Sequence, residues 1–332
     1  MCSATSRTSL SNMGKRPDKK RVPTGLILFD QMVGGGLPRG CRIEIFGEED
    51  CGKTTLALEI SRAYKKPYYM EFEQKFDDEY AQSINPTIGT EFKNMVQPFT
   101  IEEGVDDFIK KFRAIETANI KIRKENNKLK KGAKKKALKG QYDLLVMDTV
   151  GSAVTIDQIE KDMQDNDQVA SLAIQMTRFL RSKAEKILSP KGCTLIMLNH
   201  KKEVIGSGFG DGDRTPGGRH VKFTSIARFS ITRKKTTIYD DAIDMGIWFR
   251  KNHITNKTTI RKCRYLIKRG HGVVRGYETL QLGLMTKTIK EDGQFFVLGD
   301  YRMRGVKQMV EFLEANPNLR SAINEEYLTS QN

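Results

Sequence analysis

The chain has 332 residues, 38% of them apolar, which is enough for one sizeable domain core and a small appendage. No run approaches the ~20 consecutive apolar residues that a membrane span needs, and the polar N-terminus lacks the apolar segment of a secretory signal. We therefore expect neither a membrane partner nor secretion. The cysteines show no pairing or metal-ligand spacing, which favours a reducing cytoplasm and no zinc site; they are Cys2, Cys41, Cys51, Cys193 and Cys263.

The net charge of +16 is concentrated in two segments. Residues 1–22 carry six basic side chains against one acidic, and residues 121–139 carry ten against Glu125. A basic surface attracts polyanions such as nucleic acids. We expect residues 1–22 to form a flexible arm. Two interpretations stay open for the lysine-rich insertion at 121–140: a solvated helical or flexible excursion, or an added patch that contacts DNA.

Short apolar runs between longer segments predict a parallel sheet. Segments 41–46, 68–72, 142–147 and 193–198 read as strands, and an amphipathic helix is expected at about 54–64. Strands that are apolar almost throughout are typical of a mostly parallel sheet that helices cover on both faces. The chain is therefore expected to be of the α/β class.

The expected core spans residues 23–285, and a small C-terminal α/β cap follows at 286–332. Two short helices, at 306–313 and 319–327, are predicted in this cap. Within the core, six glycines fall among residues 206–218. They predict a long loop, and long loops inside compact domains are usually functional.

A phosphate-binding motif, GEEDCGKTT at residues 47–55, follows the first predicted strand and precedes the helix. It fits G-x-x-x-x-G-K-[ST], in which backbone N–H groups and a helix N-terminus surround phosphate oxygens. Lys53 is expected to reach the β- and γ-phosphates, and Thr54 and Asp148 to hold Mg²⁺. We therefore expect ATP and Mg²⁺ as cofactors. The predicted nucleotide contacts in this motif are Gly47, Glu48, Glu49, Asp50, Cys51, Gly52, Lys53, Thr54 and Thr55.

Polar side chains end two further predicted strands. Glu71 and Glu73 close the second strand, where a carboxylate is well placed to polarise water for attack on a phosphate. Asn199 and His200 close the fourth strand and lead into the glycine-rich loop, so they could sense a γ-phosphate. The alternative for these residues is an ordinary charged or satisfied polar strand end.

These motifs together resemble the RecA recombinase family, including its phage members of the UvsX type, from about residue 23 to residue 313. The family pattern E/D-x-E is matched at residues 71–73, with Asp77 and Tyr80 following. The resemblance implies a RecA-like P-loop ATPase core with a mostly parallel central sheet flanked by helices. It further implies that Glu73 is the catalytic carboxylate, that Asp77 and Tyr80 contact adenine, and that His200 senses the γ-phosphate.

The resemblance also assigns DNA-binding segments. Residues 156–168 correspond to the family's first DNA-binding loop and residues 201–218 to its second. Residues 265–269 resemble the family's strand that reaches the ATP of a neighbouring subunit, with Lys268 and Arg269 as the candidate residues. The family's second lysine aligns with Gly270, so of its two lysines only Lys268 carries over. The candidate DNA contacts are Lys201, Lys202, Arg214, Gly217, Gly218, Arg219 and Lys222.

The function that the resemblance implies is ATP-dependent strand exchange by a filament on single-stranded DNA, coupled to DNA-dependent ATP hydrolysis. Expected partners are single- and double-stranded DNA and further copies of this chain, with single-strand-binding and loader proteins as candidates. One alternative is a RecA-fold DNA helicase or branch-migration ATPase, which would need an added domain. Another is an ATP-gated assembly protein without hydrolysis.

Overall fold

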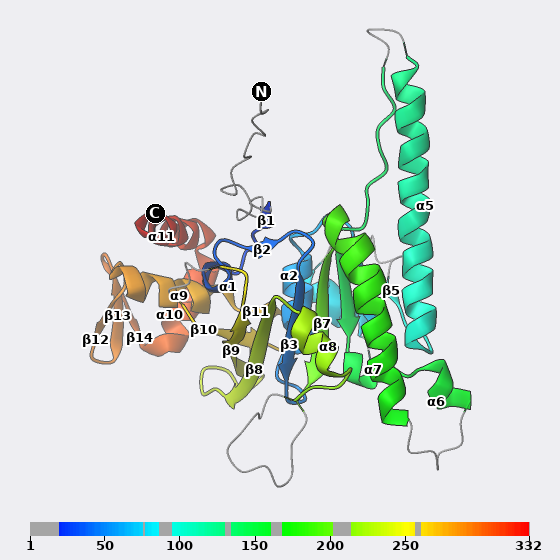
Figure 1. Cartoon of the computed structure of the whole chain (residues 1–332). Coiled ribbons are helices and arrows are strands. Elements are labelled where there is room, and N and C mark those ends of the chain that lie inside the picture. Colours follow the sequence, from blue (N-terminus) through cyan, green and yellow to red (C-terminus); the bar gives the residue numbers. More distant parts are fainter. Residues whose placement is uncertain are drawn as a thin grey trace, which may run out of the picture.

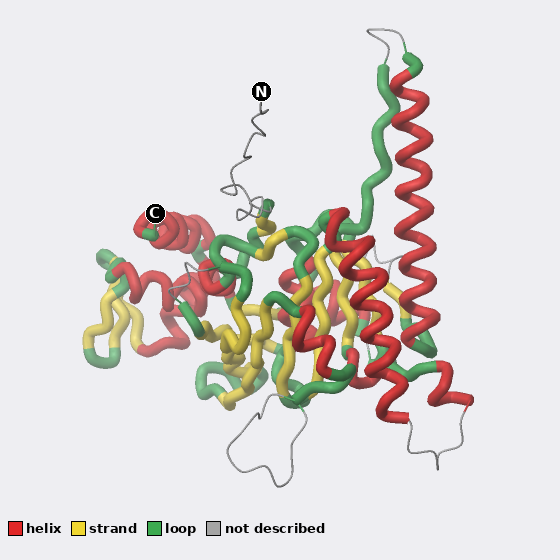
Figure 2. Tube along the Cα trace, viewed as in Figure 1, coloured by secondary structure: helices red, strands yellow, loops and turns green. Residues whose placement is uncertain are grey.

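The computed structural model describes residues 20–75, 77–85, 95–129, 134–160, 168–201, 214–255 and 260–331. In this part of the chain, nine strands form a central sheet in the order β11-β10-β9-β8-β3-β7-β6-β4-β5, with helices on both faces (Figure 1, Figure 2). The strands are β3 (Arg42–Gly47), β4 (Pro67–Glu71), β5 (Met95–Val96), β6 (Leu144–Asp148), β7 (Thr194–His200), β8 (Ala227–Lys235), β9 (Ala242–Asn252), β10 (Lys262–Lys268) and β11 (Gly272–Val273).

Two smaller sheets flank the central one. They pair β1 (Arg21–Val22) with β2 (Leu37–Pro38), and β12 (Lys290–Asp292) with β13 (Phe295–Leu298) and β14 (Tyr301–Arg304). The α-helices are α1 (Ile27–Met32), α2 (Lys53–Ser61), α3 (Asp78–Ile84), α5 (Ile101–Asn127), α6 (Ile156–Glu160), α7 (Gln168–Phe179), α8 (Arg219–Thr224), α9 (Arg275–Thr286), α10 (Gly305–Ala315) and α11 (Pro317–Ser330). Shorter helical segments are η2 (Val150–Ser152), η3 (Leu180–Leu188), which is π-helical, and η4 (Ser189–Lys191).

The sheet has a parallel half and an antiparallel half. Strands β8, β3, β7, β6, β4 and β5 pair in parallel, whereas β8, β9, β10 and β11 are joined by antiparallel pairing. In β6, Leu144 and Val146 belong to the apolar core on one face, and Leu145 and Met147 to that on the other. Alternate residues of a strand point to opposite faces, so a strand without polar positions is buried on both sides.

A third apolar cluster holds the C-terminal elements together. It contains Phe296, Met309, Leu313 and Ile323 from the small sheet, α10 and α11. Leu280 of α9 belongs to the same cluster. Helix α9 therefore packs with the C-terminal elements although it precedes residue 286.

The predicted strands all occur, with ends shifted by one or two residues, and the mixed α/β class with a mostly parallel sheet is confirmed. Two local expectations differ from the structure. Arg21 and Val22, placed in the flexible arm, form β1, and the Arg21 guanidinium donates hydrogen bonds to the carbonyls of Val33 and Gly36. The segment expected as a first DNA-binding loop begins with helix α6. None of the described helices is long and apolar enough to cross a membrane.

Candidate functional site

The carboxyl ends of four neighbouring parallel strands carry the predicted site. β3, β7, β6 and β4 are adjacent and parallel, so the segments that follow them meet at one edge of the sheet. These segments hold the phosphate-binding motif after β3, His200 at the end of β7, Asp148 at the end of β6 and Glu73 after β4. In open α/β sheets, ligands bind at this edge.

The phosphate-binding motif forms a tight loop that only some residues fit. Asp50 and Gly52 have positive φ angles of 50° and 93°, and a Cβ on Gly47 would lie 2.4 Å from the carbonyl oxygen of Ile231. Lys53 is buried, and its Nζ donates a hydrogen bond of 2.6 Å to the carbonyl of Glu48. The loop borders a cavity of about 250 Å³ lined by Gly47, Glu48, Glu49, His200 and Lys201.

Thr54 and Asp148, the predicted magnesium ligands, are in direct contact. The Thr54 hydroxyl donates to the Asp148 carboxylate at 2.7 Å, and Tyr69 donates to the same oxygen at 2.5 Å. Burial raises the pKa of Asp148 to about 6. Among the described residues no three His, Cys, Asp or Glu side chains form a metal cluster. One hydroxyl and one carboxylate are nevertheless a donor set that fits Mg²⁺, which takes few protein ligands beside phosphate and water.

Glu73 sits at the centre of a hydrogen-bond network. Its Oε1 accepts from the Thr149 hydroxyl and from His200 Nε2, both at 2.8 Å, and Ser152 lies at 3.4 Å. Burial alone would raise the pKa of Glu73, but the bonds from His200 and Thr149 outweigh it and the pKa lies below its usual value. An ionised carboxylate only accepts hydrogen bonds, so Nε2 of His200 carries the proton. Among the described residues the buried Nδ1 of His200 has no partner.

Asn199 links the end of β7 to the segment after the glycine-rich stretch. It is buried, and its Nδ2 donates to the carbonyl of Pro216 at 3.0 Å and to Glu44 at 3.1 Å. Glu44 in turn accepts from the buried Arg228. The residue beside His200 is therefore fixed both to the core of the sheet and to the chain that leaves the glycine-rich stretch.

Comparison with known proteins supports this arrangement. The sequence matches the family model of the RecA N-terminal domain over residues 4–122 and 128–273. Protein RecA of Salinispora tropica is 30% identical over 330 residues, 96% of this chain and 86% of that protein. Protein RecA of Rubrobacter xylanophilus is 31% identical over 330 residues (96% and 87%), and that of Geobacter metallireducens 30% over 315 residues (92% and 84%).

This chain belongs to the RecA family. Family membership over most of the chain makes it an ATP-dependent DNA recombinase and a DNA-dependent ATPase. RecA-family proteins bind ATP with Mg²⁺, bind single- and double-stranded DNA and assemble as homo-oligomeric filaments. The helicase or branch-migration alternative is not favoured.

The two predicted adenine contacts of this RecA-family chain lie beside α2. Tyr80 is half-buried, and its hydroxyl is 2.5 Å from that of Thr55, one residue after Thr54. Asp77 is exposed and caps α3, accepting a hydrogen bond from the backbone of Tyr80. Burial raises the pKa of Tyr80, and the charge of Arg269 acts in the opposite direction.

Lys268 is separated from the phosphate-binding loop of its own chain. The side chain of Ile267 packs under Gly52, and successive strand residues point to opposite faces, so Lys268 points away from this loop. Its Nζ lies 3.9 Å from the Asp241 carboxylate and 5.2 Å from the centre of the Tyr239 ring. The structure thus brings Lys53, Glu73 and His200 together but not Lys268.

The predicted DNA contacts split into packed and exposed residues. Gly217 and Gly218 both have φ of 83°, and a Cβ on either would lie 2.8 Å from Val150 or Ala173. These glycines therefore have a packing role in the fold. Arg214 and Arg219 are exposed, as is Lys201, whereas Lys222 is partly buried on α8; Lys202 lies outside the described residues.

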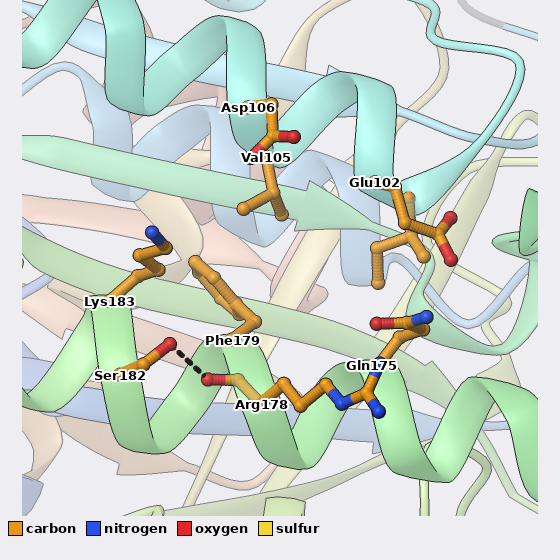
Figure 3. A pocket seen from close by; sticks show the side chains of 9 residues that line it. Glu102, Val105, Asp106, Gln175, Arg178, Phe179, Ser182 and Lys183 are labelled. Carbon is orange, nitrogen blue, oxygen red and sulfur yellow. Dashed lines mark hydrogen bonds between the residues drawn. The ribbon is translucent and has the colours of Figure 1, made fainter.

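A second cavity, of about 170 Å³, has no predicted site residue in its lining. Side chains from α5 face those from α7 and η3 across it (Figure 3). Sequence reasoning also missed three hydroxyls of the main site. Thr149 and Ser152 hold Glu73, and Tyr69 holds Asp148. Their positions in the chain could have pointed to them. Thr149 directly follows Asp148, and Tyr69 lies two residues before Glu71 and therefore on the same strand face.

Proposed function

We propose that this recombinase forms a filament on single-stranded DNA, with ATP bound between adjacent subunits, and pairs that DNA with a homologous duplex. The observation that carries the proposal is the network of Glu73, Thr149 and His200 beside the phosphate-binding loop. Lys53 exchanges its carbonyl partner for phosphate oxygens. Thr54 and Asp148 would hold Mg²⁺, which when bound would supply positive charge against the phosphates.

Glu73 acts as the general base in this proposal. Its lowered pKa keeps it ionised, so its oxygens are available to orient water and accept a proton. His200 contacts Glu73 and borders the cavity beside Lys201, where it would meet a terminal phosphate. Engagement of His200 would shift Asn199 and with it Pro216, which transmits the nucleotide state to the DNA-binding segment. Such a phosphate-dependent ordering is a known kind of switch.

Further roles are proposed for residues that the sequence indicated. Asp77 and Tyr80 would hold adenine, and Lys201, Lys202, Arg214, Arg219 and Lys222 would contact the DNA backbone. Histidine at position 200 supports a phage subtype of the UvsX kind. Single-strand-binding and loader proteins would assist assembly.

The test is formation of a displacement loop with ATP, for the unaltered protein and Glu73→Gln. The unaltered protein is expected to pair homologous DNA. Glu73→Gln is expected to bind ATP and DNA but to hydrolyse ATP about 10²–10⁴-fold more slowly, the usual contribution of a general base. Hydrolysis by Glu73→Gln at the unaltered rate would refute the role of Glu73. Fork unwinding without homologous pairing would instead identify a helicase.

A further inference from the structure

The second half of α5 and the chain that returns from it form a projecting stalk, here defined as residues 113–129 and 134–140. Buried side chains of α5 end at Phe112. The twelve residues up to Phe112 span about 18 Å, close to the ~17 Å of the five-residue strand β6. The remaining fifteen residues of α5 therefore extend about 22 Å past the sheet. Figure 1 shows this part projecting beyond the rest of the molecule.

Two asparagines fasten the returning chain to the helix. The side-chain amide of Asn119 donates to the carbonyl of Lys139 at 2.9 Å and accepts from its N–H at 2.8 Å. Asn126 makes the same pair of bonds with the backbone of Lys136, both at 2.8 Å. Each asparagine thus satisfies a backbone donor and an acceptor that would otherwise rely on water. The returning chain is thus held alongside the helix (Figure 1).

Each pair of hydrogen bonds between an asparagine and the returning backbone is called a clamp. The two clamps have the same spacing along the helix and along the returning chain. Asn119 and Asn126 are seven residues apart, which places them on the same helix face and about 10.5 Å apart along the axis. Lys139 and Lys136 are three residues apart, which is about 10 Å in an extended chain. Because the two rises agree, both clamps close without distortion. The helix and the returning chain of the stalk are therefore held in a fixed arrangement.

The charged side chains on the outer part of the stalk are almost all basic. Its part from Lys121 onward has eight basic side chains and one acidic among the described residues, a net charge of +7. The acid, Glu125, pairs with Lys136 at 2.9 Å, and the pair is exposed. Exposed like charges repel one another, so this cluster of basic side chains does not stabilise the fold. The remaining exposed cations of this part are Lys121, Arg123, Lys124, Lys128, Lys134, Lys135 and Lys139.

The stalk lies apart from the site at the carboxyl edge of the sheet. Helix α5 starts at that edge, where the N–H of Ile101 donates to Val154, and its far end is about 40 Å away. The match to the RecA family model is interrupted between residues 122 and 128, inside the stalk. Residues 123–127 of the stalk thus lie outside the match to the family, and the stalk projects from the end of the core opposite its nucleotide site.

We propose that the stalk is a second, sequence-independent binding site for duplex DNA. Its net charge of +7 is spread over roughly 15 Å of axis, where duplex DNA presents about nine phosphates and a single strand about half as many. A helix of ~10 Å with a strand against it is too wide for the ~12 Å major groove. The stalk therefore lies across the phosphate backbone and reads no bases.

The test uses a variant in which Lys121, Lys124 and Lys128 are all changed to alanine, which preserves the helix. A labelled duplex without homology is titrated into protein already loaded with oligothymidylate and a non-hydrolysable ATP analogue. The variant is expected to bind the duplex about tenfold more weakly. The slope of log affinity against log salt should fall by nearly 3, about 0.9 for each lost phosphate contact. ATP hydrolysis stimulated by single-stranded DNA should stay unchanged.

A matched control removes the same charge elsewhere, by changing Lys186, Lys287 and Lys290 to alanine; all three are exposed and lie off the stalk. It should bind duplex as the unaltered protein does, and arginine at the three stalk positions should restore binding. Equal duplex affinity for stalk variant and unaltered protein, or equal weakening by the control, would overturn the proposal. The proposal rests on charge and geometry and does not require strand exchange. The duplex titration therefore tests it even if the protein fails to pair homologous DNA.

Discussion

A glycine in a ligand-binding motif can be required by packing and not by contact with the ligand, as Gly218 shows. Gly218 has φ of 83°, and a Cβ added to it would lie 2.8 Å from the Cβ of Ala173. Gly293 has φ of 60°, and a Cβ added to it would have no atom within 4 Å. Gly218→Ala should therefore lower the free energy of unfolding by about 3 kcal/mol, and Gly293→Ala by about 1 kcal/mol. Urea denaturation measures both. Equal losses would show that α7 yields to the added methyl group.

A buried carboxyl gives the stability a pH dependence of its own. Glu278 accepts from the N–H of Leu28 at 2.9 Å and the hydroxyl of Tyr265 at 3.1 Å, and burial raises its pKa to about 7. A carboxyl whose pKa is higher folded than unfolded binds more protons when folded, so its ionisation removes up to about 3 kcal/mol of stability as pH rises from about 4.5 to 7.

Glu278→Gln keeps an acceptor oxygen and cannot ionise. Its melting temperature should exceed that of the unaltered protein above pH 7, and the difference should shrink towards pH 5. Thermal melts across this range measure the effect. A difference independent of pH would mean that Glu278 is not the group that titrates.

At the scale of elements, the clamps of the stalk make a prediction that needs no DNA. Changing Asn119 and Asn126 together to alanine removes four hydrogen bonds, each contributing about 1 kcal/mol. The returning chain should then open more often, and trypsin should cleave after Lys134–Lys139 at least about tenfold faster. Asn127→Ala, one residue away on the exposed side, is the control. Mass spectrometry of early fragments gives the rate, and similar rates for both variants would contradict the clamp.

Elements differ in how far their sequence predicts them. β3, β6 and β7 were foreseen because strands buried on both faces are apolar throughout. The hairpin of β8 and β9 was not, since one half of each strand is largely exposed and carries charges that resemble a loop. The return of the stalk depends on two asparagines meeting backbone ten and twenty residues away. No local pattern encodes such a pairing.

The candidate site was predictable where a motif has fixed chemistry. Lys53 and Thr54 begin α2 after β3, while Glu73 and His200 fall at or after strand ends, and the sheet order brings these segments together. What the sequence could not supply is which hydroxyl reaches which carboxylate. Thr149 finds Glu73 only because β6 and β4 are neighbours in the sheet.

At the scale of the whole molecule, the proposal that ATP lies between adjacent subunits makes a prediction about Lys268. Glu73 is held at the phosphate-binding loop, while Lys268 lies on the other face of β10, between Asp241 and Tyr239. Lys307 of α10 approaches the same Tyr239 ring, at 5.4 Å from its centre. Lys268 is thus positioned by its own C-terminal elements but is directed away from its own nucleotide. In the proposed filament, Lys268 would therefore serve the nucleotide of a neighbouring copy.

This geometry predicts complementation between two inactive variants. Glu73→Gln lacks the base, and Lys268→Ala lacks the group that stabilises phosphoryl charge, so each alone should hydrolyse ATP poorly on DNA. In a filament mixed at equal amounts, an intact site forms wherever a subunit with Glu73 meets a neighbour with Lys268. Random assembly makes this one interface in four, so ATPase activity should recover to about a quarter of that of the unaltered protein. If Lys268 acted within its own chain, every site would lack one group, and mixing would restore nothing.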